Sequence, residues 1–102
     1  MTRAAHVPAS LHFPDSDGRP EGWGRFTRLA ANGAELATLS RLAKGDALRL
    51  SFDVRQERFE LARADVLGVW RDADGYFVAE MRFLDEEMRA RLGRVLLELL
   101  SA

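Results

Sequence analysis

Cysteine is absent from the sequence, which excludes disulfide bridges, thiolate metal ligands and a thiol nucleophile. Long apolar runs are also absent, so no segment approaches the roughly 20 apolar residues that cross a bilayer. Residues 1–10 lack the charged and apolar regions of a signal peptide. We therefore expect a cytoplasmic protein that does not enter a membrane.

Neither sign of charge is in excess, because 15 basic and 16 acidic side chains give a net charge of −1. Proteins that bind nucleic acid through its phosphates usually carry a clear basic excess, so the balance argues against a nucleic-acid partner and leaves only a local basic patch open. Lys44 is the single lysine beside many Ala, Arg and Leu residues, which is typical of a GC-rich bacterial genome. The 102 residues fit one domain over residues 1–102, since domains run about 50–250 residues.

Alternating apolar and polar residues predict six short strands. In the clearest, residues 47–54, the apolar side chains share one face; they are Leu48, Leu50, Phe52 and Val54. The other strands are expected at residues 4–13, 23–29, 34–39, 59–70 and 76–83. Pro8 favours an edge position for the first strand, because proline has no backbone N–H to donate.

Strict alternation also assigns side chains to faces within two of these strands. In the second strand it places Leu29 on the opposite face from Phe26. In the fifth strand it places Gly68 and Trp70 on the same face as Val66.

Turns and one helix complete the pattern. Asn32-Gly33 predicts a turn because both residues tolerate positive φ, and residues 72–75 predict a hairpin. From Leu84 onward the apolar spacing becomes helical, with Asp85 as the cap. The helix is expected to bury one stripe, which consists of Leu84, Met88, Leu92, Val95, Leu96 and Leu99. We expect a mainly β fold, a six-stranded antiparallel barrel with a C-terminal α-helix.

Side chains that could catalyse a reaction form no motif. His6 and His12 share a face of the first strand about 20 Å apart, so a metal ion would need ligands from elsewhere, and surface histidines are the simpler interpretation. Glu86 and Glu87 suit the start of a helix, and no glycine-rich phosphate loop is present. We expect no enzymatic activity, no metal and no other cofactor.

Arginines gather around two aromatic residues. Arg19, Arg25 and Arg28 surround Trp23 and Phe26 in the sequence. Such a mixture can hold a nucleotide, because arginine forks bind phosphate and aromatic rings stack on bases. The alternative is a solvated strand face with both aromatic rings in the core, which the composition favours.

The order of these elements resembles a PilZ domain from about Thr2 to Leu100, and the best stretch is residues 22–54. Within it, Asn32-Gly33-Ala34 follows a strand, and Gly45-Asp46 precedes the alternating strand. A later strand and hairpin, residues 63–83, ends in a phenylalanine before the helix. PilZ domains have a six-stranded barrel followed by a helix, and many bind the bacterial second messenger cyclic di-GMP.

The first ligand motif of the PilZ family is altered in this chain. That motif is R-x-x-x-R, and its two arginines are replaced by Thr2 and His6, with Arg3 one residue out of step. In the family these arginines clamp phosphate and guanine. Their replacement implies weakened binding of cyclic di-GMP.

The second ligand motif, D/N-x-S-x-x-G, falls on Arg28, Ala30 and Gly33, and only the glycine survives. Arg28 keeps a positive charge but cannot accept a hydrogen bond from guanine, and Ala30 supplies no hydroxyl. A charge-assisted hydrogen bond is worth about 1.5–3 kcal/mol, so the loss of several removes most of a micromolar binding energy.

The resemblance therefore implies a divergent adaptor that binds another protein, in type IV pilus function, motility or polar signalling, without appreciable affinity for cyclic di-GMP. The alternative is a cyclic di-GMP receptor with a remodelled site, built from Arg3, His6, Arg25 and Arg28.

We place the partner surface on the C-terminal helix. Leu97 and Leu100 fall outside the buried stripe and form, with Gly93, a second line at helical spacing. A partner protein or a second copy of the chain would cover them. The alternative is a frayed helix end with two tolerated leucines.

Overall fold

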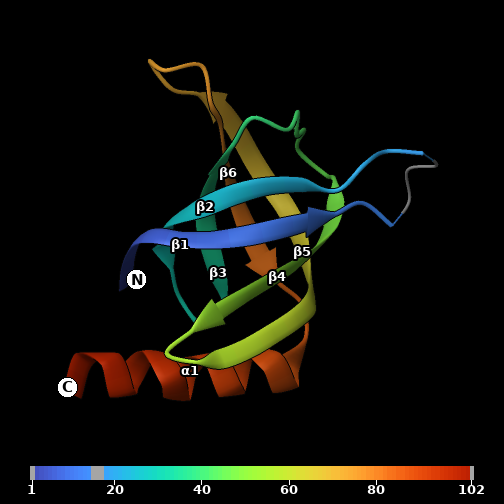
Figure 1. The fold of residues 1–102 in the computed structure, drawn as a ribbon. Helices are drawn as coiled ribbons and strands as arrows, with labels where there is room; N and C mark the ends of the chain where they lie inside the picture. Colours follow the sequence, from blue (N-terminus) through green and yellow to red (C-terminus); the bar gives the residue numbers. More distant parts are fainter. Residues whose placement is uncertain (1, 15–17, 102) are drawn as a thin grey trace.

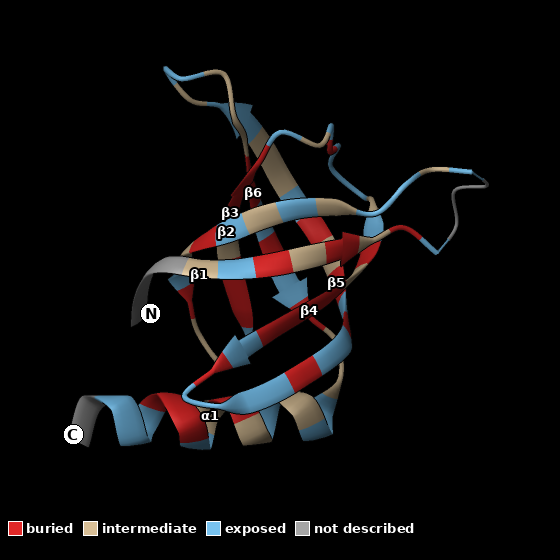
Figure 2. Ribbon diagram, in the orientation of Figure 1, coloured by how far each residue is buried: buried red, intermediate tan, exposed pale blue. Residues whose placement is uncertain are grey.

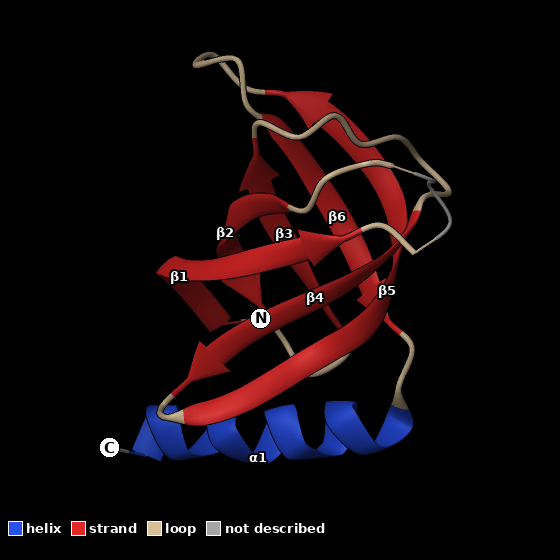
Figure 3. Cartoon of the chain, turned by 45° about the vertical axis from the view of Figure 1, so that its right-hand side comes forward, coloured by secondary structure: helices blue, strands red, loops and turns tan. Residues whose placement is uncertain are grey.

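The structure is a computed structural model that describes residues 2–14 and 18–101, with side chains described for 7–14 and 18–99. Its elements are β1 (Thr2–His12), β2 (Gly22–Leu29), β3 (Gly33–Thr38), β4 (Ala47–Val54), β5 (Glu57–Arg71), β6 (Phe77–Phe83) and α1 (Glu86–Ser101). The strands close an antiparallel barrel in the order β1-β2-β3-β6-β5-β4. The expected barrel with a C-terminal helix is therefore confirmed. Figures 1 and 3 show α1 lying across one end of the barrel and the β5–β6 hairpin projecting beyond the other.

Phenylalanine rings fill the centre of the barrel. The ring centre of Phe52 lies 4.9 Å from that of Phe26 in an edge-to-face arrangement. The same ring stacks on Phe59 and Phe83, with 5.1 Å and 6.2 Å between ring centres. All four rings are buried. Figure 2 shows the alternation of buried and exposed residues along the strands, which is the physical basis of the predicted pattern.

Two bulges change the faces that strict alternation assigned. The β2–β3 register shifts between Phe26 and Arg28, so Phe26 and Leu29 both point into the core. The β5–β6 register shifts between Val66 and Gly68, so Val69 packs against the core and Trp70 faces outward. The parity assignments for Leu29, Gly68 and Trp70 are therefore wrong, because a bulge adds one residue and reverses every later face.

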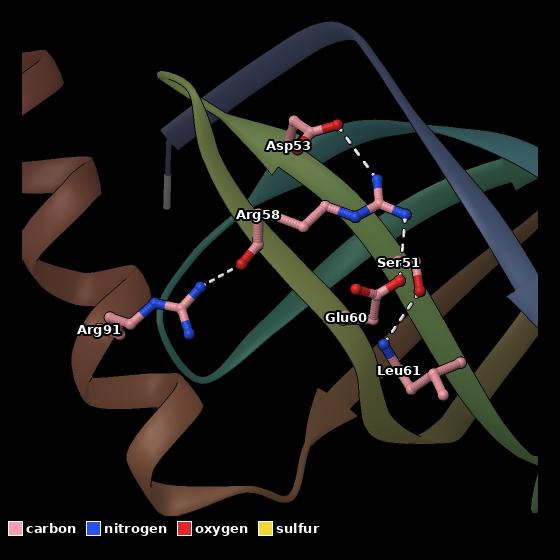
Figure 4. Close-up of polar contacts among 6 residues, drawn as sticks. All are labelled: Ser51, Asp53, Arg58, Glu60, Leu61 and Arg91. Carbon is pink, nitrogen blue, oxygen red and sulfur yellow. Dashed lines mark hydrogen bonds and ion pairs between the residues drawn. The ribbon is translucent and has the colours of Figure 1, made fainter.

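A third bulge lies in β5 and is stabilised by a buried serine. Glu60 and Leu61 of β5 together oppose Ser51 of β4, and Leu61 has a positive φ of 49°. The Ser51 hydroxyl accepts a hydrogen bond of 2.9 Å from the Leu61 amide (Figure 4). Ser51 thus gives an acceptor to a backbone donor that the ladder leaves unpaired.

Pro8 lies in a strand with two neighbours, so β1 is not an edge strand. Its pairing with β4 nevertheless covers only Ala9–His12, whereas its pairing with β2 also includes Pro8. The proline therefore occupies the part of β1 that lacks a neighbour on one side. The missing N–H removes no ladder hydrogen bond with β4.

The β2–β3 turn forms where it was predicted, although for a different reason. Ala30 and Gly33 exchange backbone hydrogen bonds across Ala31 and Asn32. Neither Asn32 nor Gly33 has a positive φ. A Cβ at Gly33 would instead collide with the carbonyl oxygen of Met81 on β6. Gly33 is therefore needed for the close approach of two strands and not for an unusual backbone conformation.

Helix α1 buries a shorter stripe than its spacing predicts. Leu92, Val95 and Leu96 are buried and Met88 packs against the core, but Leu99 is 39% exposed. The last turn of the helix carries Leu99 past the part that the barrel covers. The predicted burial of Leu99 is therefore wrong. Among the described residues no helix is long and apolar enough to span a membrane.

Asp85 starts α1 with its backbone and not with its carboxylate. Its carbonyl accepts a hydrogen bond from the Arg89 amide at 2.9 Å. Its carboxylate instead accepts hydrogen bonds from the backbone N–H of Arg63 at 3.1 Å and from the Arg63 Nε at 2.8 Å. The expected side-chain cap is thus replaced by a link between the helix start and β5.

Arg91 fixes the middle of α1 to the β4–β5 hairpin. Its guanidinium donates to the carbonyl of Arg58 and to the carboxylate of Glu57 at 3.1 Å, and it lies 4.3 Å from the centre of the Phe59 ring. Figure 4 shows this reach from the helix to β5, and beside it the Arg58 side chain between two carboxylates. These contacts hold the helix at the end of the barrel.

Candidate binding groove on the outer barrel surface

A groove of about 390 Å³ lies on the outside of the barrel, where β2 begins and β3 ends. The main residues that line it are Trp23, Arg25, Ala37, Thr38, Leu39 and Tyr76. They come from β2, from β3 and the residue after it, and from the residue before β6. The groove is therefore built from parts of three neighbouring strands of the barrel.

Large apolar side chains border this groove without being covered. Trp23 is 70% exposed and Leu39 is 73% exposed. The expected burial of Trp23 with Phe26 is thus wrong for the tryptophan and correct for the phenylalanine. Scattered single apolar residues are normal on a protein surface, but neighbouring ones that border a groove mark a binding surface.

Hydrogen bonds fix the end of the groove. The buried Thr38 hydroxyl donates to the carbonyl of Trp23 at 2.7 Å, and it accepts from the backbone N–H of Ser40 at 3.0 Å. Thr38 thereby ties the start of β2 to the chain that leaves β3. The backbone that carries Trp23 and Leu39 is therefore held in place, and a partner would meet a preformed surface.

Arg25 is the one charged residue among the described residues that line the groove. Its guanidinium carbon lies 5.7 Å from the centre of the Tyr76 ring, a cation–π arrangement. It makes no ion pair with any described side chain. The groove thus combines the large side chains of Trp23 and Leu39 with the Tyr76 ring and one positive charge.

Apolar residues continue from the groove across the outside of the sheet. In the ladder Arg25 is beside Ala37, Ala37 is beside Val78, and Val78 is beside Trp70. Ala37 and Val78 face away from the core cluster and are nevertheless buried by their neighbours, whereas Trp70 is 47% exposed. A single row thus links the groove to a second exposed tryptophan.

The positions that correspond to the PilZ ligand motifs lie at the other end of β2. Thr2 is the ladder partner of Leu29, and Arg3 is the partner of Arg28. The side chains of Thr2, Arg3 and His6 lie outside the described residues, so their arrangement stays a prediction. The structure brings the backbones of these two segments together.

Arg28 has a glutamate beside it on β3 and a second glutamate one strand further on. Its ladder partner is Glu35, whose own partner is Glu80. The Glu35 carboxylate accepts a hydrogen bond of 2.8 Å from the Thr27 hydroxyl. Ala30 and Gly33 form the adjoining turn and add no side-chain donor. In the ladder Arg28 thus lies between an arginine position on β1 and a glutamate on β3.

The structure does not bring the predicted arginine cluster together. Arg25 pairs with Pro8 in the ladder, three residues and about 10 Å along β2 from Arg28. Arg19 lies 3.7 Å from the Phe13 ring centre and donates to the carbonyl of Arg41. Each arginine therefore has a different environment, and only Arg25 lines the groove.

The residues of the predicted helix surface are also separated. A Cβ at Gly93 would lie 3.4 Å from the Cβ of Ala31, so the glycine faces the β2–β3 turn of its own chain. Leu97 is 65% exposed. The side chain of Leu100 lies outside the described residues. Gly93 therefore faces its own chain, and a Cβ at this position would make a van der Waals contact with the β2–β3 turn.

A second hollow of about 810 Å³ lies between Arg63 and the first turns of α1, and it is lined mainly by charged side chains. The backbone and side-chain hydrogen bonds from Arg63 lower the pKa of the Asp85 carboxyl. Their mutual pairing leaves this arginine and carboxylate satisfied. Among the described residues no group of three His, Asp or Glu side chains is arranged to hold a metal ion.

Sequence reasoning found Trp23 and Arg25 but missed Leu39, Trp70 and Tyr76. Leu39 was placed inside a strand, and the Trp70 face was reversed by the β5 bulge. The sequence signal that could have found Trp70 and Tyr76 is the N–H or O–H group of these side chains, which favours positions that remain partly in water.

Comparisons with known proteins add no assignment. No protein-family model matches this chain. No curated protein matches it either.

Proposed function

We propose that this chain is a divergent PilZ-like adaptor that binds another protein through the groove at Trp23, Arg25, Leu39 and Tyr76. The observation that carries the proposal is the exposure of Trp23 and Leu39, 70% and 73%, beside one another at a rigid groove. Residues that dominate protein interfaces are enriched in Trp, Tyr and Arg, and the groove has one of each. The adaptor would serve type IV pilus function, motility or polar signalling.

The expected barrel with a C-terminal helix supports the PilZ-like part of the proposal. The ladder position of Glu35 beside Arg28, with Glu80 one strand further on, supports the part that excludes cyclic di-GMP as the ligand. A nucleotide with two phosphates would need several cations, and Arg28 is the one described cation at the motif positions.

The test of this function compares three forms of the protein. The native chain, the double variant Trp23→Ala/Leu39→Ala and the control variant Leu67→Ala are immobilised, and captured proteins are identified by mass spectrometry. Leu67 is a suitable control because it is an exposed leucine outside the groove. We expect proteins that bind the native chain and the control but not the double variant. Equal capture by all three would contradict the proposal.

The alternative function, a cyclic di-GMP receptor, has its own test. Isothermal titration of the native chain with cyclic di-GMP should give no measurable heat at micromolar concentrations. Binding that is lost in Arg28→Ala but kept in Trp23→Ala would establish a remodelled nucleotide site at the motif positions. In that outcome the adaptor proposal fails.

The C-terminal helix is a second proposed partner surface, either for another protein or for a homodimer. Leu97 carries this proposal because it is 65% exposed on the side of α1 that the barrel does not cover. Analytical ultracentrifugation of native protein and of Leu97→Glu tests the homodimer. A monomer in both forms would contradict it.

A further inference from the structure

We propose that the groove recognises a protein segment in which one carboxylate side chain is flanked by large apolar side chains. This inference rests on the proposed function, because it names the chemistry of the partner that binds there. Arg25, its neighbours and the free-energy cost of covering its charge carry this inference.

Arg25 differs from the arginines that pair with carboxylates of this chain. Arg58, Arg63 and Arg91 all form ion pairs within the chain. The Arg25 guanidinium makes no ion pair and no hydrogen bond with a described residue, and its one contact of this kind is the ring of Tyr76. The guanidinium therefore keeps all its N–H donors available to a partner.

A partner that covers the groove must supply an acceptor for this guanidinium. Trp23 and Leu39 attract apolar side chains, and such side chains would displace the water around Arg25. Covering an unpaired charge opposes binding, whereas a carboxylate restores two parallel hydrogen bonds to the guanidinium fork. The Tyr76 ring helps to hold the guanidinium plane in place for this contact. The apolar border and the unpaired cation thus select the same kind of partner.

The position of Arg25 also says where the carboxylate lies within the segment. Trp23 is two residues away on β2, about 7 Å along the strand. Trp70 is reached through Ala37 and Val78, about 14 Å across three strand spacings. Apolar surface therefore lies in two directions from the cation, along β2 and across the sheet, and a segment that covers both passes over the cation between them. The carboxylate belongs inside the segment, with apolar residues before and after it.

A phosphate-bearing ligand fits this surface less well than a peptide. Arg25 is the only charged residue among the described residues that line the groove. Nucleic acids and nucleotides are held by several cations together, whereas one carboxylate needs only one guanidinium. The number of charges therefore favours an acidic and apolar protein segment.

The experiment uses peptides displayed on phage. A library of random twelve-residue peptides is selected on the native protein and, separately, on Arg25→Glu. We expect selection on the native protein to enrich Asp or Glu between large apolar residues. We expect Arg25→Glu to lose this enrichment and to select Lys or Arg instead. Enrichment without acidic residues on the native protein would overturn the inference.

Affinities of one selected peptide then identify the contact. By fluorescence anisotropy, Arg25→Glu should weaken binding at least tenfold, and so should replacing the acidic residue of the peptide by its amide. Arg28→Glu is the matched control, and it should change the affinity less than twofold because Arg28 lies at the other end of β2. Equal effects of the two variants would overturn the inference. Circular dichroism and thermal unfolding of each variant establish that it is folded.

These outcomes separate the inference from the proposed function. Peptides that need Trp23 and Leu39 but are indifferent to Arg25 would contradict the acidic partner and leave the groove as a protein-binding site. Peptides that bind Trp23→Ala/Leu39→Ala as well as they bind the native chain would contradict both. Binding of cyclic di-GMP that Arg25→Glu abolishes would also overturn the inference, because the groove would then serve a phosphate ligand.

Discussion

Seven of the nine aromatic residues of this protein form two sets that follow different rules. The inner set has no polar atom in its side chains and meets at the centre of the barrel; it consists of Phe26, Phe52, Phe59 and Phe83. The outer set has an N–H or O–H group and lies on the outside of the sheet; it consists of Trp23, Trp70 and Tyr76. The inner set stabilises the fold, whereas the outer set is available to bind.

The difference shows that hydrophobicity alone does not decide which aromatic residues are buried. A buried indole or phenol needs a hydrogen-bond partner, and the barrel interior offers few acceptors. Thr38 and Ser51 are the buried polar side chains among the described residues, and both already have partners. Phenylalanine is therefore the aromatic residue that this interior accepts at no polar cost.

The largest effect is expected from the inner set. Phe52→Ala should lower the free energy of unfolding by about 3–5 kcal/mol, because it opens a cavity between three other rings. Urea unfolding followed by circular dichroism measures the loss. Trp23→Ala is the control, and it should change the free energy by less than about 0.5 kcal/mol. Comparable losses in the two variants would break the division into inner and outer sets.

The next effect concerns backbone contact between β3 and β6. Gly33→Ala should lower the free energy of unfolding by about 1–3 kcal/mol, because its Cβ would collide with the Met81 carbonyl oxygen. Gly68→Ala is a matched control, since a Cβ there meets open space. Thermal unfolding of both variants compares them. A Gly33→Ala protein as stable as Gly68→Ala would mean that the strands can separate without cost.

A smaller effect depends on pH. The pKa of the Asp85 carboxyl lies below its ordinary value of 3.8, first because the Arg63 backbone N–H donates to it and then because the Arg63 side chain does. The ionised form thus stabilises the fold above the unfolded-state pKa, and this stabilisation is lost as the pH falls below about 4. Asp85→Asn should cost less than about 1 kcal/mol at pH 7, since the pair is partly exposed.

The contribution of Asp85 is measured as a difference between two pH values. Urea unfolding of the native protein and of Asp85→Asn at pH 7 and pH 3 should show a smaller gap between the two forms at the lower pH. A gap that does not shrink would mean that the Arg63–Asp85 pair contributes nothing to stability.

The smallest effect on folding is expected at the outer surface of α1. Leu97→Glu combined with Leu100→Glu should change the free energy of unfolding by less than about 0.5 kcal/mol, because Leu97 is mostly exposed. The same variant should lose any self-association of the native protein, as measured by ultracentrifugation. Unfolding of the double variant would instead place these leucines in the core.

The barrel, the succession of strands and turns along the chain, and most of the core could be predicted from the sequence. Residues 47–54 alternate cleanly and form β4 with the predicted buried face. Alternation failed at Leu29 and Trp70, because each follows a bulge that no residue type announces in a single sequence. Bulges depend on the register between two strands, and periodicity within one strand does not contain that information.

The candidate site could be predicted only in part, for the same reason. Arg25 and Trp23 are conspicuous in the sequence, but their neighbours Leu39 and Tyr76 come from other strands. Only the ladder order brings these positions together. Conversely, Arg19 and Arg28 are close to Arg25 in the sequence and have separate surroundings in the fold.

Because both tryptophans face outward, their fluorescence depends on whether a partner covers them. Trp23 and Trp70 are 70% and 47% exposed, and the sequence has no other tryptophan. We expect their emission to lie close to that of indole in water, because both side chains are largely outside the core, and we expect unfolding to change it little. A partner that covers the groove would move Trp23 into an apolar environment and shift its emission to shorter wavelength. We therefore expect the intrinsic fluorescence of this chain to change when a partner binds and to change little when the chain unfolds.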